Sequence, residues 1–214
     1  SPDLVAPIAA LNAADPVTGP AIAEGLSARG YATAALGEDA RGRQQGRGAF
    51  HALALAAGRL MALPDGPRVA AFELTGWDTH AQQVNRLNGP LSQLDEGLGG
   101  LKEALGEHWQ RTAVLVVTEF GRTVRVNGTA GTDHGTGGVA FLAGGAVAGG
   151  RVGGDWPGLS ERALFQGRDL APTTDIRSLA KGLLRDHLKL SAQAVARAFP
   201  GSDTASPASG LVRA

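Results

Sequence analysis

Residues 113–119 read AVLVVTE, a short apolar run that ends on a glutamate. Small and β-branched side chains without polar interruption are typical of a strand that is buried on both faces. Residues 139–145 (VAFLAGG) and 68–76 (RVAAFELTG) follow the same pattern. We therefore expect three short core strands in this part of the chain.

A helical pattern separates the first two of these strands along the chain. Between residues 83 and 108 leucines recur every three or four positions, although Pro90 and the glycines of 97–100 weaken the pattern. Strand, helix and strand in this order predict a parallel β-α-β crossover. The expected fold is therefore α/β, a mostly parallel sheet with helices on both faces.

The rest of the chain predicts further helices and a tail. Apolar periodicity and capping residues predict helices over 17–29, over 46–62, over 173–190 with Thr173 or Thr174 as N-cap, and over 191–198 from Ser191. Residues 201–214 have a disordered composition. We expect residues 1–200 to form a single α/β domain and residues 201–214 to be a flexible tail.

Composition excludes several classes of function. The 214 residues are 43% hydrophobic with zero formal net charge, which gives no electrostatic reason to bind nucleic acid or an anionic membrane. The absence of Cys excludes disulfides and thiolate chemistry. No apolar run reaches the roughly 18 residues of a membrane span. The glycine-rich stretch 144–154 lacks the Gly-Lys-Ser/Thr ending of a nucleotide-binding P-loop.

Polar clusters stand next to each of the three expected strands. GWDTH (76–80) and TEFGR (118–122) close the first two strands, and GTDHG (131–135) precedes the third. In open α/β sheets, sites form outside the carboxyl ends of the strands. Asp78 and His80, two residues apart, point to one side of an extended chain. We therefore expect the three clusters to meet in one crevice.

The residue types in these clusters indicate a metal site. Oxygen and imidazole ligands together suit Zn²⁺, with Mn²⁺, Mg²⁺ or Ca²⁺ as alternatives. Arg122 would hold a small anionic ester substrate through a phosphate or sulfate group. The expected metal ligands are Asp78, His80, Glu119, Asp133 and His134.

Each of these residues also has an ordinary structural interpretation. Asp-x-His is a common pattern, and Glu119 alone also fits a helix cap or an ion pair with Arg122. Asp133 also fits a turn and His134 a hydrogen-bonded loop residue. Histidines in predicted helices are expected to pack or face solvent; they are His51, His108 and His187.

The order of the motifs GWDTHAQQ, VVTEFGRT and NGTAGTDHGTGGVAFLAGG resembles a bacterial family, domain of unknown function 1501. The resemblance covers most of the chain, including RDLAPTTDIRSLAKGLL. It implies a place in the alkaline phosphatase and sulfatase superfamily, whose members are metal-dependent hydrolases on an α/β sheet. In that superfamily an Asp and a His follow a core strand, as Asp78 and His80 do, and a later His precedes a strand, as His134 does.

The sequence departs from the superfamily pattern at two places. The superfamily has an Asp-His pair where this chain has Glu119 and Phe120, so the resemblance implies one metal or a differently built site. The superfamily's nucleophile follows an early strand that has no counterpart before Arg68. We therefore expect this chain to be the C-terminal half of a larger alkaline phosphatase-like domain, with the N-terminal half missing.

These observations predict two alternative functions. The first is a metal-dependent hydrolase of phosphate or sulfate esters, or the metal-binding half of one. The second is a non-catalytic exported binding or assembly module that retains the fold. Members of the family it resembles often carry a twin-arginine export signal, so we expect a periplasmic or exported protein whose signal lies outside this chain, with the cytoplasm as the alternative.

Overall fold

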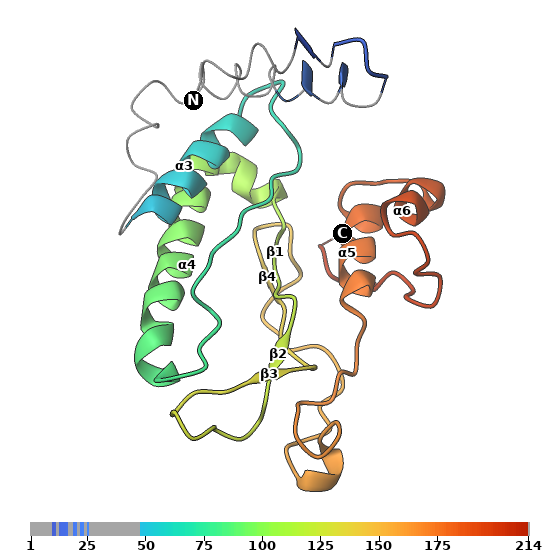
Figure 1. Ribbon diagram of the computed structural model, residues 1–214. Coiled ribbons are helices and arrows are strands. Elements are labelled where there is room, and N and C mark those ends of the chain that lie inside the picture. The colour runs from blue at the N-terminus through green and yellow to red at the C-terminus, as the bar shows by residue number, and fades with distance from the viewer. Residues whose placement is uncertain are drawn as a thin grey trace. The chain divides into compact units, whose positions relative to one another are not determined.

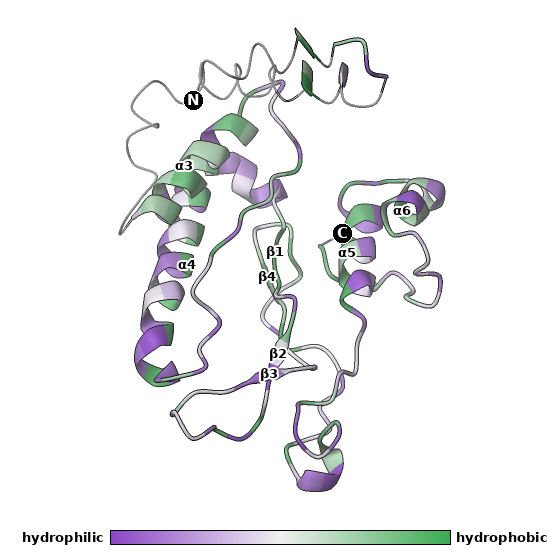
Figure 2. Cartoon of the chain, viewed as in Figure 1, coloured by the Kyte–Doolittle hydropathy of each residue, from purple (hydrophilic) through white to green (hydrophobic). Residues whose placement is uncertain are grey.

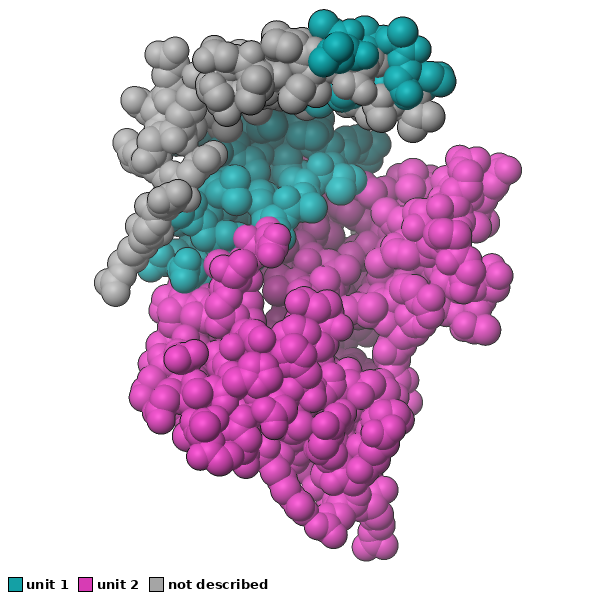
Figure 3. Space-filling model, in the orientation of Figure 1, with its two compact units in different colours: residues 1–72, 93–105 teal, residues 73–92, 106–214 magenta. Residues whose placement is uncertain are grey.

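The computed structural model describes residues 48–213 and, nearer the N-terminus, residues 10–11, 13–16, 19–20, 22–23 and 25. The helix expected over 17–29 therefore lies largely outside the described residues. The chain divides into two compact units (Figure 3). One unit comprises residues 1–72 and 93–105, and the other comprises residues 73–92 and 106–214.

Two helices form the described core of the first unit. Helix α3 spans Ala49–Met61, and the C-terminal part of helix α4 (Gln83–Leu105) packs beside it (Figure 1). Figure 2 shows that α3 is mostly hydrophobic. Gly97 lies against the ring of Phe50, where a Cβ would overlap with the ring atoms. The glycines that weaken the helical pattern of α4 therefore let the two helices approach closely, and both predicted helices are confirmed.

Four short strands belong to the second unit: β1 (Val114–Val116), β2 (Gly121–Arg122), β3 (His134–Gly135) and β4 (Phe141–Ala143). Strand β1 pairs antiparallel with β4, and β2 pairs antiparallel with β3. The second pair lies within the connection of the first, so the chain runs out through β1 and β2 and returns through β3 and β4 (Figure 1). The register places Arg122 directly opposite His134.

The prediction of a mostly parallel sheet with helices on both faces is wrong. Every strand pair in the described part of the chain is antiparallel, and the sheets have two strands each. Residues 68–76 are described throughout and form no strand, and Val69 is 67% exposed. Because β1 pairs with a segment that returns through a hairpin, α4 does not connect parallel strands. The strands expected over 113–119 and 139–145 are present in shortened form.

Helices α5 (Ile176–Asp186) and α6 (Ala192–Ala198) end the sequence of elements. The expectation that Thr173 or Thr174 caps α5 is wrong, because the side chain of Asp175 accepts a hydrogen bond from the backbone N–H of Arg177. The helix predicted over 191–198 is present as α6, and Ser191 is its N-cap, accepting from the backbone N–H of Ala194. Figure 2 shows hydrophobic and hydrophilic stretches on α5, as expected for a helix with one buried face.

Residues 201–213, whose composition is typical of a flexible tail, lie along α5. The Nζ of Lys181 donates to the carbonyls of Ser202 and Ala205, at 2.5 and 2.9 Å. The backbone N–H of Ala208 donates to the carbonyl of Ser178 at 2.9 Å. These bonds attach the C-terminal segment to α5.

Candidate metal centre

Two backbone segments carry the candidate ligands. Asp78 and His80 lie on the irregular segment that leads into α4, and His134 is the first residue of β3. The two segments are joined at Gln83, whose Oε1 accepts hydrogen bonds from the hydroxyls of Thr79 and Thr132, at 3.0 and 2.6 Å. The start of α4 therefore fixes the distance between the segment of Asp78 and the segment of His134.

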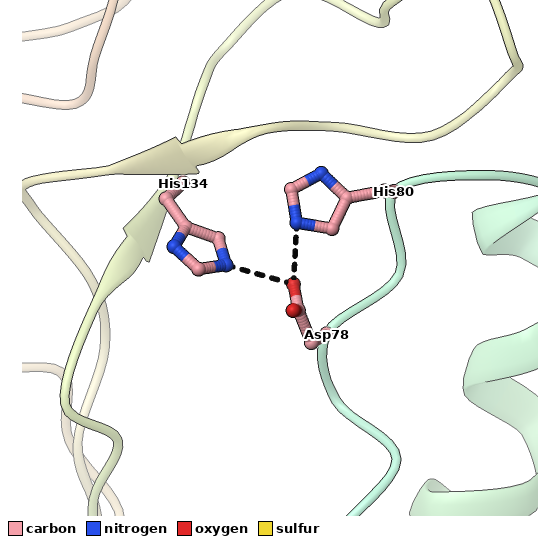
Figure 4. A group of neighbouring side chains, drawn as sticks. All are labelled: Asp78, His80 and His134. Atoms are coloured by element: carbon pink, nitrogen blue, oxygen red, sulfur yellow. Dashed lines mark hydrogen bonds and ion pairs between the residues drawn. The ribbon is translucent and has the colours of Figure 1, made fainter.

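Asp78, His80 and His134 converge on one point (Figure 4). The Oδ1 of Asp78 lies 2.9 Å from the Nε2 of His80 and 2.9 Å from the Nε2 of His134. The three ligand atoms lie within 4.8 Å of one another. Each side chain remains about half exposed, at 50%, 48% and 51% respectively. The structure thus brings together three of the five predicted ligands, at a place that solvent reaches.

Arg122 holds the carboxylate of this group in place. Its Nη2 donates to the Oδ1 of Asp78 at 2.7 Å and to the carbonyl of Trp77 at 2.8 Å. Its Nη1 donates to the carbonyl of Thr132 at 2.8 Å. A guanidinium has five N–H donors, and these bonds use three of them. Arg122 therefore ties the Asp78 segment to the hairpin, rather than presenting its whole fork to a substrate.

Asp133 lies next to the cluster of Asp78, His80 and His134 and contacts the opposite nitrogen of the His80 ring. Its Oδ1 is 3.1 Å from the Nδ1 of His80, whereas the Nε2 of that ring faces Asp78. The Nδ2 of Asn127 also donates to this Oδ1, at 3.0 Å. Asp133 is therefore bonded to a ligand residue and is not a member of the three-residue cluster.

Glu119 is the other predicted ligand that the structure does not bring into the cluster. Its carboxylate is 3.5 Å from the hydroxyl of Thr118, and its neighbour Phe120 takes the place beside His134 instead. The rings of Phe120 and His134 stack with centroids 3.9 Å apart and planes inclined by 14°. Glu119 lies at a bend between β1 and β2, and the residue after it, Phe120, is the one that contacts His134.

Two amide side chains were missed by reasoning from the sequence. The Oδ1 of Asn127 accepts from the backbone N–H groups of Thr129 and Gly131, and its Nδ2 donates to the carbonyl of His80. Gln83 joins the two ligand-bearing segments as described above. Asn-Gly at 127–128 is a turn signal that indicates a structural role for Asn127; no comparable signal marks Gln83.

A glycine permits the closest backbone approach in the centre. A Cβ at Gly131 would overlap with the carbonyl group of His80. Ala81 and Ala130 form an isolated antiparallel bridge at the same place. Gly131 therefore lets the 127–133 loop lie directly on the backbone of His80.

A family model described as a protein of unknown function (DUF1501) matches residues 2–199. The chain belongs to the DUF1501 family. The resemblance predicted from GWDTH, VVTEFGRT and GTDHG is thereby confirmed at the level of this family. No curated protein and no solved structure matches the chain. Among the helices that the structure describes, none is long and apolar enough to cross a membrane.

Both carboxylates of this DUF1501 centre are ionised more readily than free aspartate. Partial desolvation raises the pKa of Asp78, but the hydrogen bonds from His134 and Arg122 and the electrostatic interaction with His80 and His134 together lower it by more, so the net change is downward. Hydrogen bonds from Asn127 and then His80 lower the pKa of Asp133. The three-residue cluster offers one carboxylate and two imidazoles, which are donor types that bind divalent cations such as Zn²⁺.

Proposed function

We propose that Asp78, His80 and His134 bind a divalent metal ion, and that this DUF1501 chain is a metal-dependent hydrolase of phosphate or sulfate esters or the metal-binding part of one. The observation that carries the proposal is the convergence of the three ligand atoms within 4.8 Å. Exposed ion pairs contribute little to stability, so stability alone does not explain this convergence.

The donor set supports Zn²⁺ as the metal. Two imidazole nitrogens and one carboxylate oxygen match the His₂-carboxylate sets of catalytic zinc sites, which keep a further position open. Mg²⁺ and Ca²⁺ prefer sets made only of oxygen atoms, and Mn²⁺ favours oxygen more than Zn²⁺ does. The half-exposed side chains leave the open position accessible from solvent.

The chemistry of the hydrolase follows from the resemblance to alkaline phosphatases and sulfatases that the motifs carry. A bound metal ion supplies Lewis acidity toward an anionic ester and lowers the pKa of a bound water. Within the chain, Asp78 and the two histidines would bind the metal ion, and Arg122 would hold the carboxylate of Asp78 in place. The three hydrogen bonds of Arg122 use three of its five N–H donors. We propose that the other two bind an anionic group of the substrate.

An assay with generic aryl phosphate and aryl sulfate substrates tests this proposal. The wild-type chain is loaded with Zn²⁺, Mn²⁺ or Ca²⁺, and turnover is compared with that of His134→Ala. His108→Ala serves as the control, because His108 is also an imidazole but hydrogen-bonds Arg111 instead. A complete hydrolase should show turnover with Zn²⁺ that His134→Ala abolishes and His108→Ala retains, whereas the metal-binding part of one should bind Zn²⁺ through His134 with little turnover. Equal, measurable turnover in both variants would contradict the proposal.

The alternative is a non-catalytic exported binding or assembly module. It is favoured by Arg122, which donates to three protein oxygens, and by Phe120, which occupies the place beside His134. In that case the centre holds a structural ion, and the protein acts in the periplasm or outside the cell. Zinc binding that requires His134 but is accompanied by no turnover of either ester would exclude a complete hydrolase and would fit this alternative.

A further inference from the structure

The two histidines of the centre are held in different ways. His134 belongs to strand β3, where it pairs with Arg122 in the ladder and stacks on Phe120. His80 lies on an irregular segment outside the named strands. Its orientation therefore depends on hydrogen bonds to the ring and to the adjacent backbone.

Each nitrogen of the His80 ring faces a different carboxylate. Nε2 lies 2.9 Å from the Oδ1 of Asp78, and Nδ1 lies 3.1 Å from the Oδ1 of Asp133. An ionised carboxylate can only accept hydrogen bonds, so the contact with Asp133 requires a proton on Nδ1, and the contact with Asp78 makes the same demand on Nε2 while no metal is bound. A metal ion at the cluster would take the place of the proton on Nε2, and Asp133 would keep the proton on Nδ1.

Asp133 is itself held by the loop that carries it. The Nδ2 of Asn127 donates both to the Oδ1 of Asp133, at 3.0 Å, and to the carbonyl of His80, at 2.9 Å. The hydroxyl of Thr129 donates to the same carbonyl at 2.7 Å. The loop therefore contacts His80 at its backbone and at its ring, and fixes both relative to each other.

We propose that Asp133 is a positioning residue rather than a metal ligand: it keeps the proton of His80 on Nδ1 so that Nε2 is presented to the metal, and Asn127 holds Asp133 in that position. This inference rests on the proposed metal centre. It gives a role to Asp133 and Asn127, which contact a metal ligand but not the metal. Metal-binding histidines commonly donate their second ring N–H to a carboxylate, which sets the tautomer and the ring orientation.

The first test is the affinity of the chain for Zn²⁺, measured by competition with a chelating dye. Loss of such a partner weakens metal binding by roughly 10–100-fold, and we expect this for Asp133→Ala. Asp133→Asn keeps an oxygen acceptor and should recover part of the loss. Asp155→Ala removes an exposed carboxylate elsewhere in the same unit and should bind like the wild type. Thermal unfolding of each variant establishes that it is folded.

A second variant tests the role of Asn127 without removing its turn. Asn127→Asp keeps the oxygen that accepts from the backbone of Thr129 and Gly131, but replaces the donor to Asp133 with a second carboxylate. We expect weaker zinc binding than in the wild type. Unchanged affinity would contradict the role assigned to Asn127.

The tautomer of His80 provides a readout that a merely structural role would not change. Nitrogen-15 spectra of the zinc-loaded chain, with the His80 signals assigned by their loss in His80→Gln, should show the ring proton on Nδ1. In Asp133→Ala this proton should exchange faster with solvent, because the carboxylate that accepts it has been removed. An unchanged exchange rate of the Nδ1 proton in Asp133→Ala would contradict the inference.

The outcomes separate this inference from the proposed function. A wild-type chain that does not bind Zn²⁺ overturns the metal centre and the inference with it. A wild type that binds Zn²⁺, with Asp133→Ala binding equally well, overturns the inference alone. Loss of binding in Asp133→Ala as complete as in His134→Ala, with no recovery in Asp133→Asn, also overturns it, because Asp133 would then be a ligand.

Discussion

The candidate metal centre and the α5 region are both polar networks of the second unit, but they are built in opposite ways. Lys181 on α5 is only 6% exposed, and its Nζ donates to two backbone carbonyls of the C-terminal segment. Asp78 is half exposed, and its Oδ1 is shared by His80, His134 and Arg122. In the α5 network a buried ammonium group donates to neutral carbonyls. In the candidate centre, charged and polar side chains contact one another where solvent reaches them.

This difference separates stability from function. A buried polar group without a partner costs free energy of folding, so the bonds of Lys181 are needed for the fold itself. An exposed carboxylate or imidazole without a partner is solvated by water at little cost. The convergence at Asp78 is thus not required by folding, and we expect changes there to affect binding rather than stability.

Replacement of Asp78 should have the largest effect. Asp78→Asn removes the charge on the oxygen that both histidines face, and we expect zinc affinity to fall by more than the roughly 10–100-fold that loss of an outer partner costs. The melting temperature should change little, because the side chain is half exposed. Isothermal titration and thermal unfolding measure the two effects, with Asp155→Asn as the control for charge. A large loss of stability without loss of zinc binding would show that Asp78 serves the fold rather than zinc binding.

Replacement of Lys181 should show the opposite pattern. Lys181→Met keeps the alkyl chain but leaves the carbonyls of Ser202 and Ala205 without this donor, which we expect to cost about 1–3 kcal/mol of unfolding free energy. Zinc affinity should stay at the wild-type value. Denaturant unfolding and the same titration test both statements. Weaker zinc binding in Lys181→Met would mean that the two networks are coupled.

A matched pair of glycines tests the backbone of the centre. Gly131→Ala places a Cβ against the carbonyl group of His80, so the loop must shift; at Gly128 a Cβ meets no heavy atom within 4 Å. We expect Gly131→Ala to lower zinc affinity by about tenfold, which is the smaller of the losses seen when a residue that orients a metal ligand is changed. Gly128→Ala should bind like the wild type. Equal affinities in both variants would show that the loop contact does not support His80.

The smallest effect should appear in the acid stability of the α5 region. Hydrogen bonds from the side chain and then the backbone N–H of Arg177 lower the pKa of Asp175 to about 2. Because this pKa lies below the roughly 3.9 of an unfolded chain, the folded chain binds fewer protons here, and the stabilisation present above about pH 4 is lost as the pH falls toward 2. Asp175→Asn remains an N-cap but cannot titrate. Its melting temperature should therefore fall less than that of the wild type on acidification.

Local features of the fold could be predicted from the sequence, whereas the pairing of strands could not. Helices α3, α4 and α6 follow from apolar spacing and from the cap at Ser191, which are local signals. The apolar run 113–119 indicates a strand but does not name its partner. Its partner is Phe141–Ala143, which returns through a hairpin whose turn contains Asn127 and Gly128. Asn-Gly is a hairpin signal, and giving it more weight would have favoured the antiparallel arrangement.

The candidate centre was predictable in the same partial way. The spacing of Asp78 and His80 in an extended segment indicated a shared direction, and the order of the motifs pointed to His134. Glu119 is predicted as a ligand because it closes an apolar run, but it lies at a bend after β1, and an apolar run does not show where the strand ends and the chain bends. Asn127 and Gln83 act through long-range hydrogen bonds, which spacing along the chain does not show.

The most direct test of the metal centre is a crystal structure of the chain grown with Zn²⁺, with anomalous differences recorded at the zinc edge. We predict one strong anomalous peak within about 2.0–2.2 Å of the Nε2 atoms of His80 and His134 and of a carboxylate oxygen of Asp78. Asp133 should remain bonded to the Nδ1 of His80, outside the coordination sphere. A zinc-loaded crystal with no peak at these three side chains, or with the peak at Glu119, would contradict the account.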